Sequence, residues 1–359
     1  MSAHLRRYQG YSIFVVIVIV LSGCRKSPES SDKYLDRPLC DHVFTPGPTD
    51  IQVVGFYPSW NESRLSISDI PWNRLTRIVY AFATPLPDGN IDTRSLVSVK
   101  QLTDSAHQHG IEIYFSVGGG DGSANFPALA GAKESRDKFV KEVRQYVFEN
   151  CLDGVDIDWE YWTGSADNIV IPSESSALVE ILRSLKTELS PFNLGISVDL
   201  EKSDWAGKNF YDDVSLYADH LQVMCYDFSG PWSAPGPHSS YEDAIGSGST
   251  VSSTGLAYWV NFRGWPKEKI LLGVPFFGRD FDNQGGNPVA YNDIIKLSPD
   301  AYLNDRINNI YYDGIVTMAK KAQYVSDNGF AGIMIWEITL DSFTDSTSLL
   351  YTIDKILKP

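Results

Sequence analysis

The feature of this sequence that most constrains its fold is an alternation of short apolar runs with longer amphipathic stretches, which begins at residue 51. Runs of this length that are rich in β-branched residues predict buried strands. Eight candidate strands lie at residues 51–57, 75–83, 111–119, 152–160, 193–200, 220–228, 269–277 and 331–338. Helical periodicity lies between several of them, at residues 135–150, 175–189 and 312–329. A strand followed by a helix, repeated eight times, predicts an α/β fold of the (β/α)8 type, a TIM barrel.

Three carboxylates stand at the end of the fourth candidate strand. Asp156, Asp158 and Glu160 are spaced two residues apart, and the period of a strand points all three side chains the same way. The active site of such a barrel lies at the C-terminal ends of its strands. Carboxylates this close together cannot all ionise freely, so at least one is expected to hold a proton near neutral pH. The strand therefore predicts a site for acid–base chemistry.

Two alternatives explain this acidic segment less well. A calcium-binding loop would need a glycine where Tyr161 stands and a glutamate where Asp167 stands. A solvated acidic turn does not account for Val155, Ile157 and Trp159, which are interleaved with the acids. The segment is therefore interpreted as a strand that leads into a catalytic site.

The acidic segment also resembles a known signature. Residues 153–160 read DGVDIDWE and match the pattern D-G-x-D-x-D-x-E of glycoside hydrolase family 18, the chitinase family. Residues 116–119, SVGG, are similar to the family's second signature, S-x-G-G. Further similarity lies at residues 55–60, 224–227, 273–279 and 336–337, and the likeness spans residues 51–355. The resemblance implies a TIM-barrel glycosidase that cleaves β-1,4 linkages of N-acetylglucosamine polymers, either chitin or chitooligosaccharides.

The resemblance assigns roles to the acidic residues and their neighbours. Glu160 would be the general acid/base, and Asp158 would hold the 2-acetamido group of the substrate against the anomeric carbon. The substrate would then supply its own nucleophile, with the anomeric configuration retained. Asp156 would share a proton with Asp158, and Tyr57 and Ser116 would support that pair.

Further matching residues are candidates for binding the substrate. Tyr226 would contact the carbonyl region of the acetamido group and completes the predicted catalytic set. Met224 and Asp227 would line the same subsite. Trp336 would form the floor on which the −1 sugar stacks, a contact that needs a flat ring, although a plain core tryptophan is its alternative.

Trp232 is a further substrate-binding candidate. Arg279 is either another candidate for binding the substrate or a structural ion-pair partner.

The chain departs from the family in one respect. Many family members insert an α+β domain after the seventh strand. Here about thirty residues, 280–309, separate that strand from the next helical pattern. We predict that the insertion domain is absent or much reduced, and that the cleft is shallow.

The N-terminus predicts export and a lipid anchor. Arg6 and Arg7 precede an apolar run at residues 13–21, which is shorter than the roughly 20 residues that a membrane span needs. Residues 21–24, LSGC, resemble the lipobox of bacterial lipoproteins, in which the cysteine is acylated. An ordinary secretory signal with an incidental cysteine is the alternative.

These observations define the predicted domains. Residues 1–23 are a lipoprotein signal peptide, residues 24–50 a polar, flexible tether, and residues 51–359 the catalytic barrel. We expect an exported protein, anchored to a membrane of the bacterial cell envelope through lipidated Cys24.

Composition narrows the choice of partners. The formal charge is −15, with 30 basic and 45 acidic residues and no basic block, which excludes nucleic acid. The six histidines and four cysteines show no metal-ligand spacing, so we expect no metal and no cofactor. We also expect a monomer.

The cysteines are interpreted one by one. Cys225 is expected to face outward as an inert small hydrophobe, and Cys151 is interpreted in the same way. One disulfide involving Cys40 stays possible, with its pairing open.

Two alternative functions stay open at this stage. An endo-β-N-acetylglucosaminidase acting on N-glycans would share the acidic signature, although residues 224–227 and Trp232 look more like those of chitinases. A non-catalytic chitin-binding lectin usually lacks the glutamate or an aspartate of the signature, whereas this chain has all of them.

Overall fold

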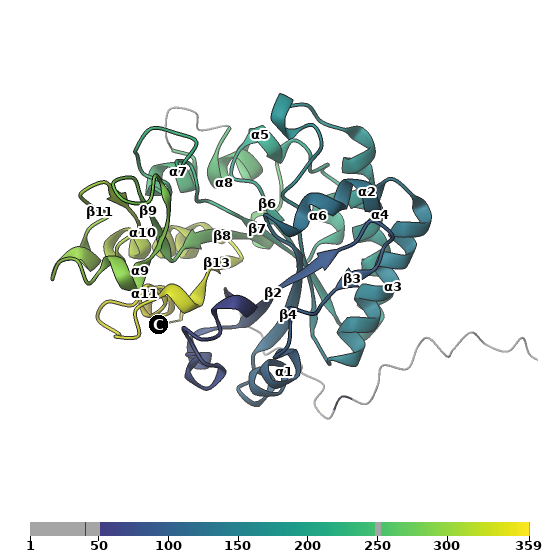
Figure 1. Ribbon diagram of the computed structural model, residues 1–359, viewed down its shortest axis with the longest axis horizontal. Coiled ribbons are helices and arrows are strands. Elements are labelled where there is room, and N and C mark those ends of the chain that lie inside the picture. The colour runs from purple at the N-terminus through teal and green to yellow at the C-terminus, as the bar shows by residue number, and fades with distance from the viewer. Residues whose placement is uncertain (1–39, 41–50, 248–252, 359) are drawn as a thin grey trace, which may run out of the picture. The chain divides into compact units, whose positions relative to one another are not determined.

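The computed structural model describes residues 40, 51–247 and 253–358 (Figure 1). Eight parallel strands form the barrel: β1 (Gln52–Pro58), β2 (Arg77–Pro85), β4 (Glu112–Gly118), β5 (Gly154–Asp158), β6 (Gly195–Leu200), β7 (His220–Val223), β8 (Ile270–Pro275) and β13 (Gly332–Trp336). Each strand pairs with its neighbours along the chain, and β1 pairs with both β2 and β13, which closes the ring. The predicted fold class is confirmed. The predicted signal peptide, Cys24 and most of the predicted tether lie outside the described residues.

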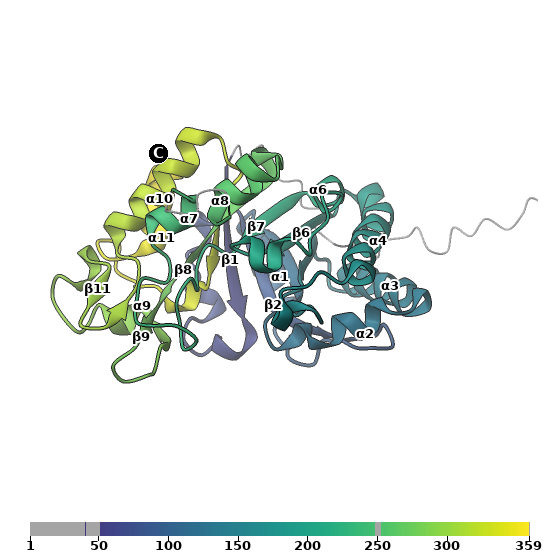
Figure 2. The ribbon, with the colours of Figure 1, turned by 90° about the horizontal axis from the view of Figure 1, so that it is seen from above.

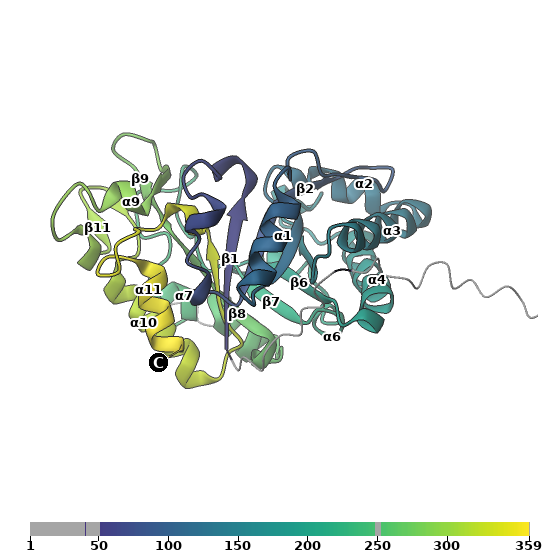
Figure 3. The same ribbon diagram turned by 90° about the horizontal axis from the view of Figure 1, so that it is seen from below.

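Helices surround the strands. Figures 1 and 2 show α3 (Lys133–Glu149) and α4 (Pro172–Leu189) on one side of the strands, with α10 (Ile315–Asn328) and α11 (Leu349–Leu357) on the other. Figure 3 shows α10 and α11 packed side by side, and α1 (Val99–Gln108) near β1. Shorter helices are α2 (Phe126–Ala130), α5 (Asp204–Gly207), α6 (Val214–Tyr217), α7 (Tyr241–Ile245) and α8 (Gly255–Ala257). Within the described residues, no helix is both long and apolar enough to cross a membrane.

The helix ends follow local sequence signals. The three predicted helices correspond to α3, α4 and α10. Helix α10 ends at Gly329, whose φ of 68° lies in the left-handed region that glycine adopts without steric cost. Gly329 therefore caps the C-terminus of this helix.

The connection from β1 to β2 differs from the expected strand–helix unit. It contains three short 3-10 turns, Ser59–Asn61, Ile67–Asp69 and Trp72–Arg74, and no α-helix. Pro71 lies just before the last turn, where it interrupts helical hydrogen bonding. Buried side chains in this segment are spaced two or three residues apart, which suits tight turns better than one face of an α-helix. The expectation of eight strand–helix units was wrong for this first one.

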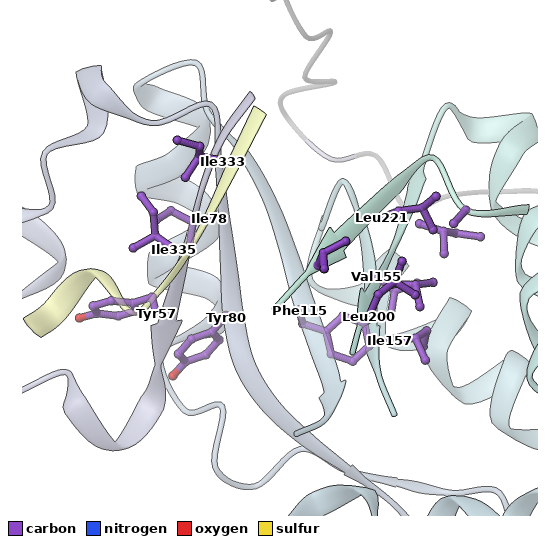
Figure 4. Close-up of a cluster of buried hydrophobic side chains, with 14 of the residues drawn as sticks. Tyr57, Ile78, Tyr80, Phe115, Val155, Ile157, Leu200, Leu221, Ile333 and Ile335 are labelled. Atoms are coloured by element: carbon purple, nitrogen blue, oxygen red, sulfur yellow. The ribbon is translucent and has the colours of Figure 1, made fainter. Parts of the chain in front are cut away.

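The strands alternate between two apolar layers. Side chains that point outward pack beneath the helices, and Figure 4 shows this layer with Tyr57, Tyr80, Val155, Ile157 and Ile335 among its members. The intervening residues point into the barrel, and Val54, Phe56, Val79, Ala81 and Met334 belong to this inner cluster. This two-residue period decides which side chains can reach the mouth of the barrel.

A small antiparallel sheet follows β8. Its strands are β9 (Phe277–Asp280), β10 (Asn287–Ala290), β11 (Arg306–Ile307) and β12 (Ile310–Tyr311), with the short helix α9 (Tyr291–Ile294) after β10. The two-residue strand β3 (Ile91–Asp92) extends β2 in the same antiparallel manner. The insertion after the seventh barrel strand is therefore reduced to one small sheet, the second of the two predicted possibilities.

A disulfide joins Cys40 to Cys151, with 5.7 Å between their Cα atoms and a sequence separation of 111. The interpretation of Cys151 as an inert hydrophobe was wrong. Cys151 lies in the turn between α3 and β5 and is partly exposed, so its sulfur can reach a segment that precedes the barrel. Cys225 is unpaired and buried in the outer layer, as expected, and burial raises its pKa to about 12.

Candidate active site

A pocket of about 170 Å³ opens where the barrel strands end. Six of the predicted site residues line it: Asp158, Glu160, Met224, Tyr226, Asp227 and Trp336. Five residues that were not predicted also line it: Phe56, Phe82, Gly120, Asp199 and Met334. The pocket therefore combines carboxyl groups on one side with apolar and aromatic side chains on the other.

Asp156 lies fully buried beneath the pocket. Its Cα register partners are Ser116 on β4 and Ser197 on β6, which places both hydroxyl groups beside its carboxyl. Ser116 Oγ and Ser197 Oγ each donate to it at 2.6 Å, and Gln222 Nε2 donates at 2.9 Å. Ser116 therefore occupies the supporting position that was expected for it.

The contact predicted between Asp156 and Asp158 is absent from the described structure. Asp156 is hydrogen-bonded to Asp199 instead, and the Oδ1 atom of Asp158 is buried without a hydrogen-bond partner. Asp158 lies one inward-facing position further along β5 than Asp156, whereas Asp199 reaches Asp156 from the neighbouring strand β6. Burial, followed by the charges of Glu160 and Asp156, raises the pKa of Asp158 well above its usual range.

Glu160 stands two residues beyond the end of β5. Its backbone N–H donates to Ser123 Oγ at 2.9 Å, and that hydroxyl donates to the carbonyl oxygen of Asp158 at 2.8 Å. Burial and then the negative charge of Glu201 raise the pKa of Glu160 to about 8, while Lys202 acts to lower it. A carboxyl with this pKa carries a proton at neutral pH and can donate it.

The SVGG segment supports the end of β5 from β4. Gly118 has a φ of 121°, and a Cβ added there would lie 2.0 Å from the carbonyl oxygen of Asp158. Gly119 has a φ of 79°, and its N–H donates to the same oxygen at 3.0 Å. Only glycine allows these two backbones to approach so closely.

Asp227 and Arg279 form an ion pair at the edge of the pocket. Arg279 Nη2 lies 2.6 Å from Asp227 Oδ2, and His238 Nδ1 lies 3.4 Å from Asp227 Oδ1. Burial acts to raise the pKa of Asp227, but the nearby His238 and Arg279 outweigh it and lower the pKa. Arg279 does not line the pocket, so of the two expectations for this residue the structural ion pair is the one found.

Tyr57 does not reach the pocket, which corrects its predicted place beside the aspartates. Its ring stacks on Tyr80 in the outer layer, with 6.2 Å between centroids (Figure 4), and its hydroxyl donates to the carbonyl of Leu65 at 2.6 Å. The preceding residue, Phe56, points inward and lines the pocket. The prediction was wrong by one residue, and on a strand one residue changes the face.

The predicted tryptophans differ in position. Trp336 lines the pocket, and its ring stacks on Phe82 with 5.5 Å between centroids. Trp60 lies at this cluster, 6.3 Å from Trp336, with 58% of its surface exposed. Trp232 lies outside the pocket lining, is 64% exposed and has the guanidinium of Arg279 5.2 Å from its ring centroid.

Among the residues missed by sequence reasoning, Asp199 had a readable signal. The strand residues 195–200 read GISVDL, so Ser197 and Asp199 alternate with apolar residues and share the inward face. Phe82 had no such signal, because its strand is apolar on both faces. Within the described part of the chain, no group of three or more His, Cys, Asp or Glu side chains is arranged to hold a metal ion.

The profile of glycosyl hydrolases family 18 matches residues 52–341. The chain belongs to glycosyl hydrolases family 18. This family member is similar in structure to the GH18 chitinase ChiB from the chitin utilization locus of Flavobacterium johnsoniae, with a TM-score of 0.73 and 30% identity over 86% of this chain and 94% of that one. It is also similar to a chitinase from Bacteroides thetaiotaomicron, with a TM-score of 0.76 and 25% identity over 86% of this chain and 97% of that one.

A sequence relative is a chitinase-like effector of Moniliophthora roreri, which is 32% identical over 241 residues. That match covers 63% of this chain and 58% of the relative. The family 18 chain thus spans little more than half the length of this relative.

Proposed function

We propose that this protein hydrolyses β-1,4 linkages of N-acetylglucosamine polymers, chitin or chitooligosaccharides, with Glu160 as the general acid/base. The observation that carries the proposal is a buried carboxyl that holds a proton at neutral pH, next to Asp158 in a pocket at the mouth of the barrel. The two similar bacterial structures are both chitinases, which supports the substrate class.

The arrangement of carboxyl groups favours a nucleophile supplied by the substrate. Asp158 ends β5 and Glu160 follows it by two residues, so the alternation of an extended chain brings both carboxyl groups to the same side of the sugar. A carboxylate nucleophile would have to attack the anomeric carbon from the side of the sugar opposite to these two groups. The acetamido oxygen of the substrate reaches the anomeric carbon there, as enzymes of this family are known to allow.

The reaction then proceeds in two steps. Glu160 gives its proton to the glycosidic oxygen as the bond from the anomeric carbon to that oxygen breaks, and the acetamido oxygen bonds to the carbon. Asp158 and Tyr226 orient the acetamido group and stabilise the charge that develops on it. A water molecule then attacks the anomeric carbon and gives a proton to Glu160, while the bond from that carbon to the acetamido oxygen breaks and restores the free acetamido group. The product has retained configuration.

The test of this function is product analysis on a partly acetylated glucosamine polymer. Substrate assistance requires an acetamido group at the −1 site, so every new reducing end should be N-acetylglucosamine, and the fully deacetylated polymer should stay uncut. Glucosamine at the new reducing ends in proportion to its share of the polymer would contradict the mechanism.

Two alternative functions are distinguished by the same assay with added substrates. Release of glycans from a high-mannose glycoprotein, without cleavage of chitooligosaccharides, would assign the endo-β-N-acetylglucosaminidase activity. Binding of chitooligosaccharides without cleavage would assign a lectin.

We also propose that the protein is exported and anchored to the bacterial cell envelope through lipidated Cys24. The LSGC sequence at residues 21–24 supports this, although it lies outside the described residues. Cys24→Ala should release the protein from the membrane fraction and abolish incorporation of labelled palmitate, because several acyl chains are needed for a stable anchor. Ser27→Ala is the matched control, and unchanged membrane retention of Cys24→Ala would contradict the anchor.

A further inference from the structure

Asp199 is a buried carboxylic acid of the pocket to which the proposed mechanism gives no role. It lies on β6, points into the barrel and is 2% exposed. Its Cα register partner on β7 is Gln222, and the side chain of Asp199 lines the pocket together with Asp158 and Glu160. Asp199 therefore shares the pocket with the reacting carboxyl groups and lies on the strand next to that of the buried Asp156.

The carboxyl groups of Asp199 and Asp156 are hydrogen-bonded to each other. Gln222 Nε2 donates to both, at 3.0 Å to Asp199 Oδ1 and 2.9 Å to Asp156 Oδ1. Ionised carboxylates only accept hydrogen bonds, so two carboxyl groups can bond each other only when one of them carries a proton. The pair therefore holds one proton.

The donors around the pair indicate which member carries that proton. Asp156 accepts hydrogen bonds from Ser116, Ser197 and Gln222, whereas among the described residues Asp199 accepts one from Gln222. Hydrogen bonds donated to a carboxyl favour its ionised form. Asp156 is therefore the carboxylate, and Asp199 is the acid that donates to it.

This arrangement has a consequence for Asp158. The carboxylate of Asp156 already receives four donors when Asp199 is counted, so it has no need of a proton from Asp158. The Oδ1 atom of Asp158 is correspondingly buried with no protein partner in the described residues. A buried polar atom without a partner is costly, and one that lines a pocket is positioned to accept a donor from a ligand.

We infer that Asp199 is a positioning residue, which donates its proton to Asp156 and so leaves Asp158 free to accept the N–H of the substrate's acetamido group. This inference rests on the proposed function and extends it. Asp199 keeps its proton throughout, so the two steps of the proposed reaction are unchanged. Asp199 acts before the substrate binds, because its hydrogen bond to Asp156 takes the place of one from Asp158.

The surrounding charges agree with a protonated Asp199. Burial raises its pKa well above the usual range, and the negative charges of Asp156, Asp158 and Glu160 add to this effect. The other titratable groups around these carboxyls are Arg77, Asp121, Glu201, Lys202, Tyr226 and Asp227. Arg77 and Lys202 are the cations, and they act on Asp156 and Glu160 respectively.

Two uncharged replacements of Asp199 test whether its hydrogen-bond donor toward Asp156 is needed. Asp199→Asn keeps an N–H donor toward Asp156, whereas Asp199→Leu, similar in size, removes it. On a chitooligosaccharide we expect kcat to fall about threefold for Asp199→Asn, and on the order of tenfold or more beyond that for Asp199→Leu, because Asp156 then competes for Asp158. Equal losses in the two variants would contradict the role of the donor.

The pH profile of Asp199→Asn tests the proton directly. A protonated Asp199 contributes no charge, so the basic limb of kcat/KM should keep its wild-type position in this variant. An ionised Asp199 would raise the pKa of Glu160, and its replacement by asparagine would then move the basic limb to lower pH. That shift would overturn the inference.

A measurement independent of hydrolysis completes the test. In protein labelled with 13C at the aspartate carboxyl carbons, the Asp199 signal is identified by its loss in Asp199→Asn. We expect it at the carboxylic-acid position from about pH 5 to about pH 7, well above the ordinary aspartate range. A carboxylate position at neutral pH would overturn the inference. If the wild-type protein cuts no chitooligosaccharide, the proposed function fails, and this signal still decides the state of Asp199.

Discussion

The carboxyl of Glu160 keeps a proton at neutral pH because of where it lies rather than because of its residue type. Burial disfavours its charged form, Glu201 adds a like charge, and Lys202 opposes both with a positive one. An ordinary glutamate would be ionised at this pH and would be unable to protonate a leaving group.

The first prediction at the residue scale concerns pH. The acid form of Glu160 is the active one, so kcat/KM should be high below its pKa of about 8 and fall as the pH rises through that value. Glu201→Gln removes a charge that raises this pKa and should move the basic limb to lower pH, whereas Lys202→Gln should move it to higher pH. Measured pH–rate profiles in which both variants shift the same way would contradict the assignment.

The second prediction concerns the proton of Glu160 itself. Glu160→Gln keeps the shape of the side chain but has no transferable proton, so kcat should fall by about 10²–10⁴-fold while oligosaccharide binding persists. Steady-state kinetics on an unactivated oligosaccharide and calorimetric binding measure the two effects. A variant with near-normal kcat would require another general acid.

At the scale of elements, α10 is tied to the barrel by a buried ion pair. Lys321 Nζ lies 2.6 Å from Asp313 Oδ2, and it also donates to Ser239 O and Ser239 Oγ, each at 2.7 Å. Lys321 is fully buried and Asp313 is 2% exposed. The ion pair therefore joins the helix to the segment just before it, and the hydrogen bonds to Ser239 join it to the segment that precedes α7.

Removal of this lysine should be strongly destabilising. Lys321→Met fills a similar volume but leaves Asp313 buried without its counter-charge, so we expect the free energy of unfolding to fall by about 3–5 kcal/mol. Lys320→Met, at the neighbouring exposed position, is the matched control and should change stability little. Urea denaturation measures both, and equal effects would show that the buried pair is unimportant.

At the scale of the whole molecule, the disulfide connects the segment before the barrel to its middle. The bond from Cys40 to Cys151 closes a loop of 111 residues, which includes the first strands and α3. A cross-link of this span restricts the unfolded chain more than a short one would. Its contribution to stability therefore arises mainly in the unfolded state.

The loss of the disulfide should lower stability without changing the active site. We expect Cys40→Ser to reduce the free energy of unfolding by about 2–4 kcal/mol, with kcat unchanged, since neither cysteine lines the pocket. A reducing agent should produce the same loss in the wild-type protein and no further loss in Cys40→Ser. A wild-type protein insensitive to reduction would contradict the bond.

Much of the fold followed from patterns that act locally. The eight strands, three helices and the helix end at Gly329 could be predicted because periodicity and glycine conformation depend on near neighbours in the chain. The clustering of Asp158 and Glu160 followed from the period of a single strand. The turns after β1 could not be predicted in this way, because their apolar residues are ordered by packing against the barrel.

The sequence by itself thus determined the barrel, the acidic strand and the glycines that support it, since each depends on one element and its period. Tertiary structure alone decided that Cys40 pairs with Cys151, that Tyr57 faces outward and that Asp156 bonds to Asp199 rather than to Asp158. These contacts join residues from different strands or from outside the barrel. The pair of Asp156 and Asp199 depends on the register between β4, β5, β6 and β7, which no single strand specifies by itself.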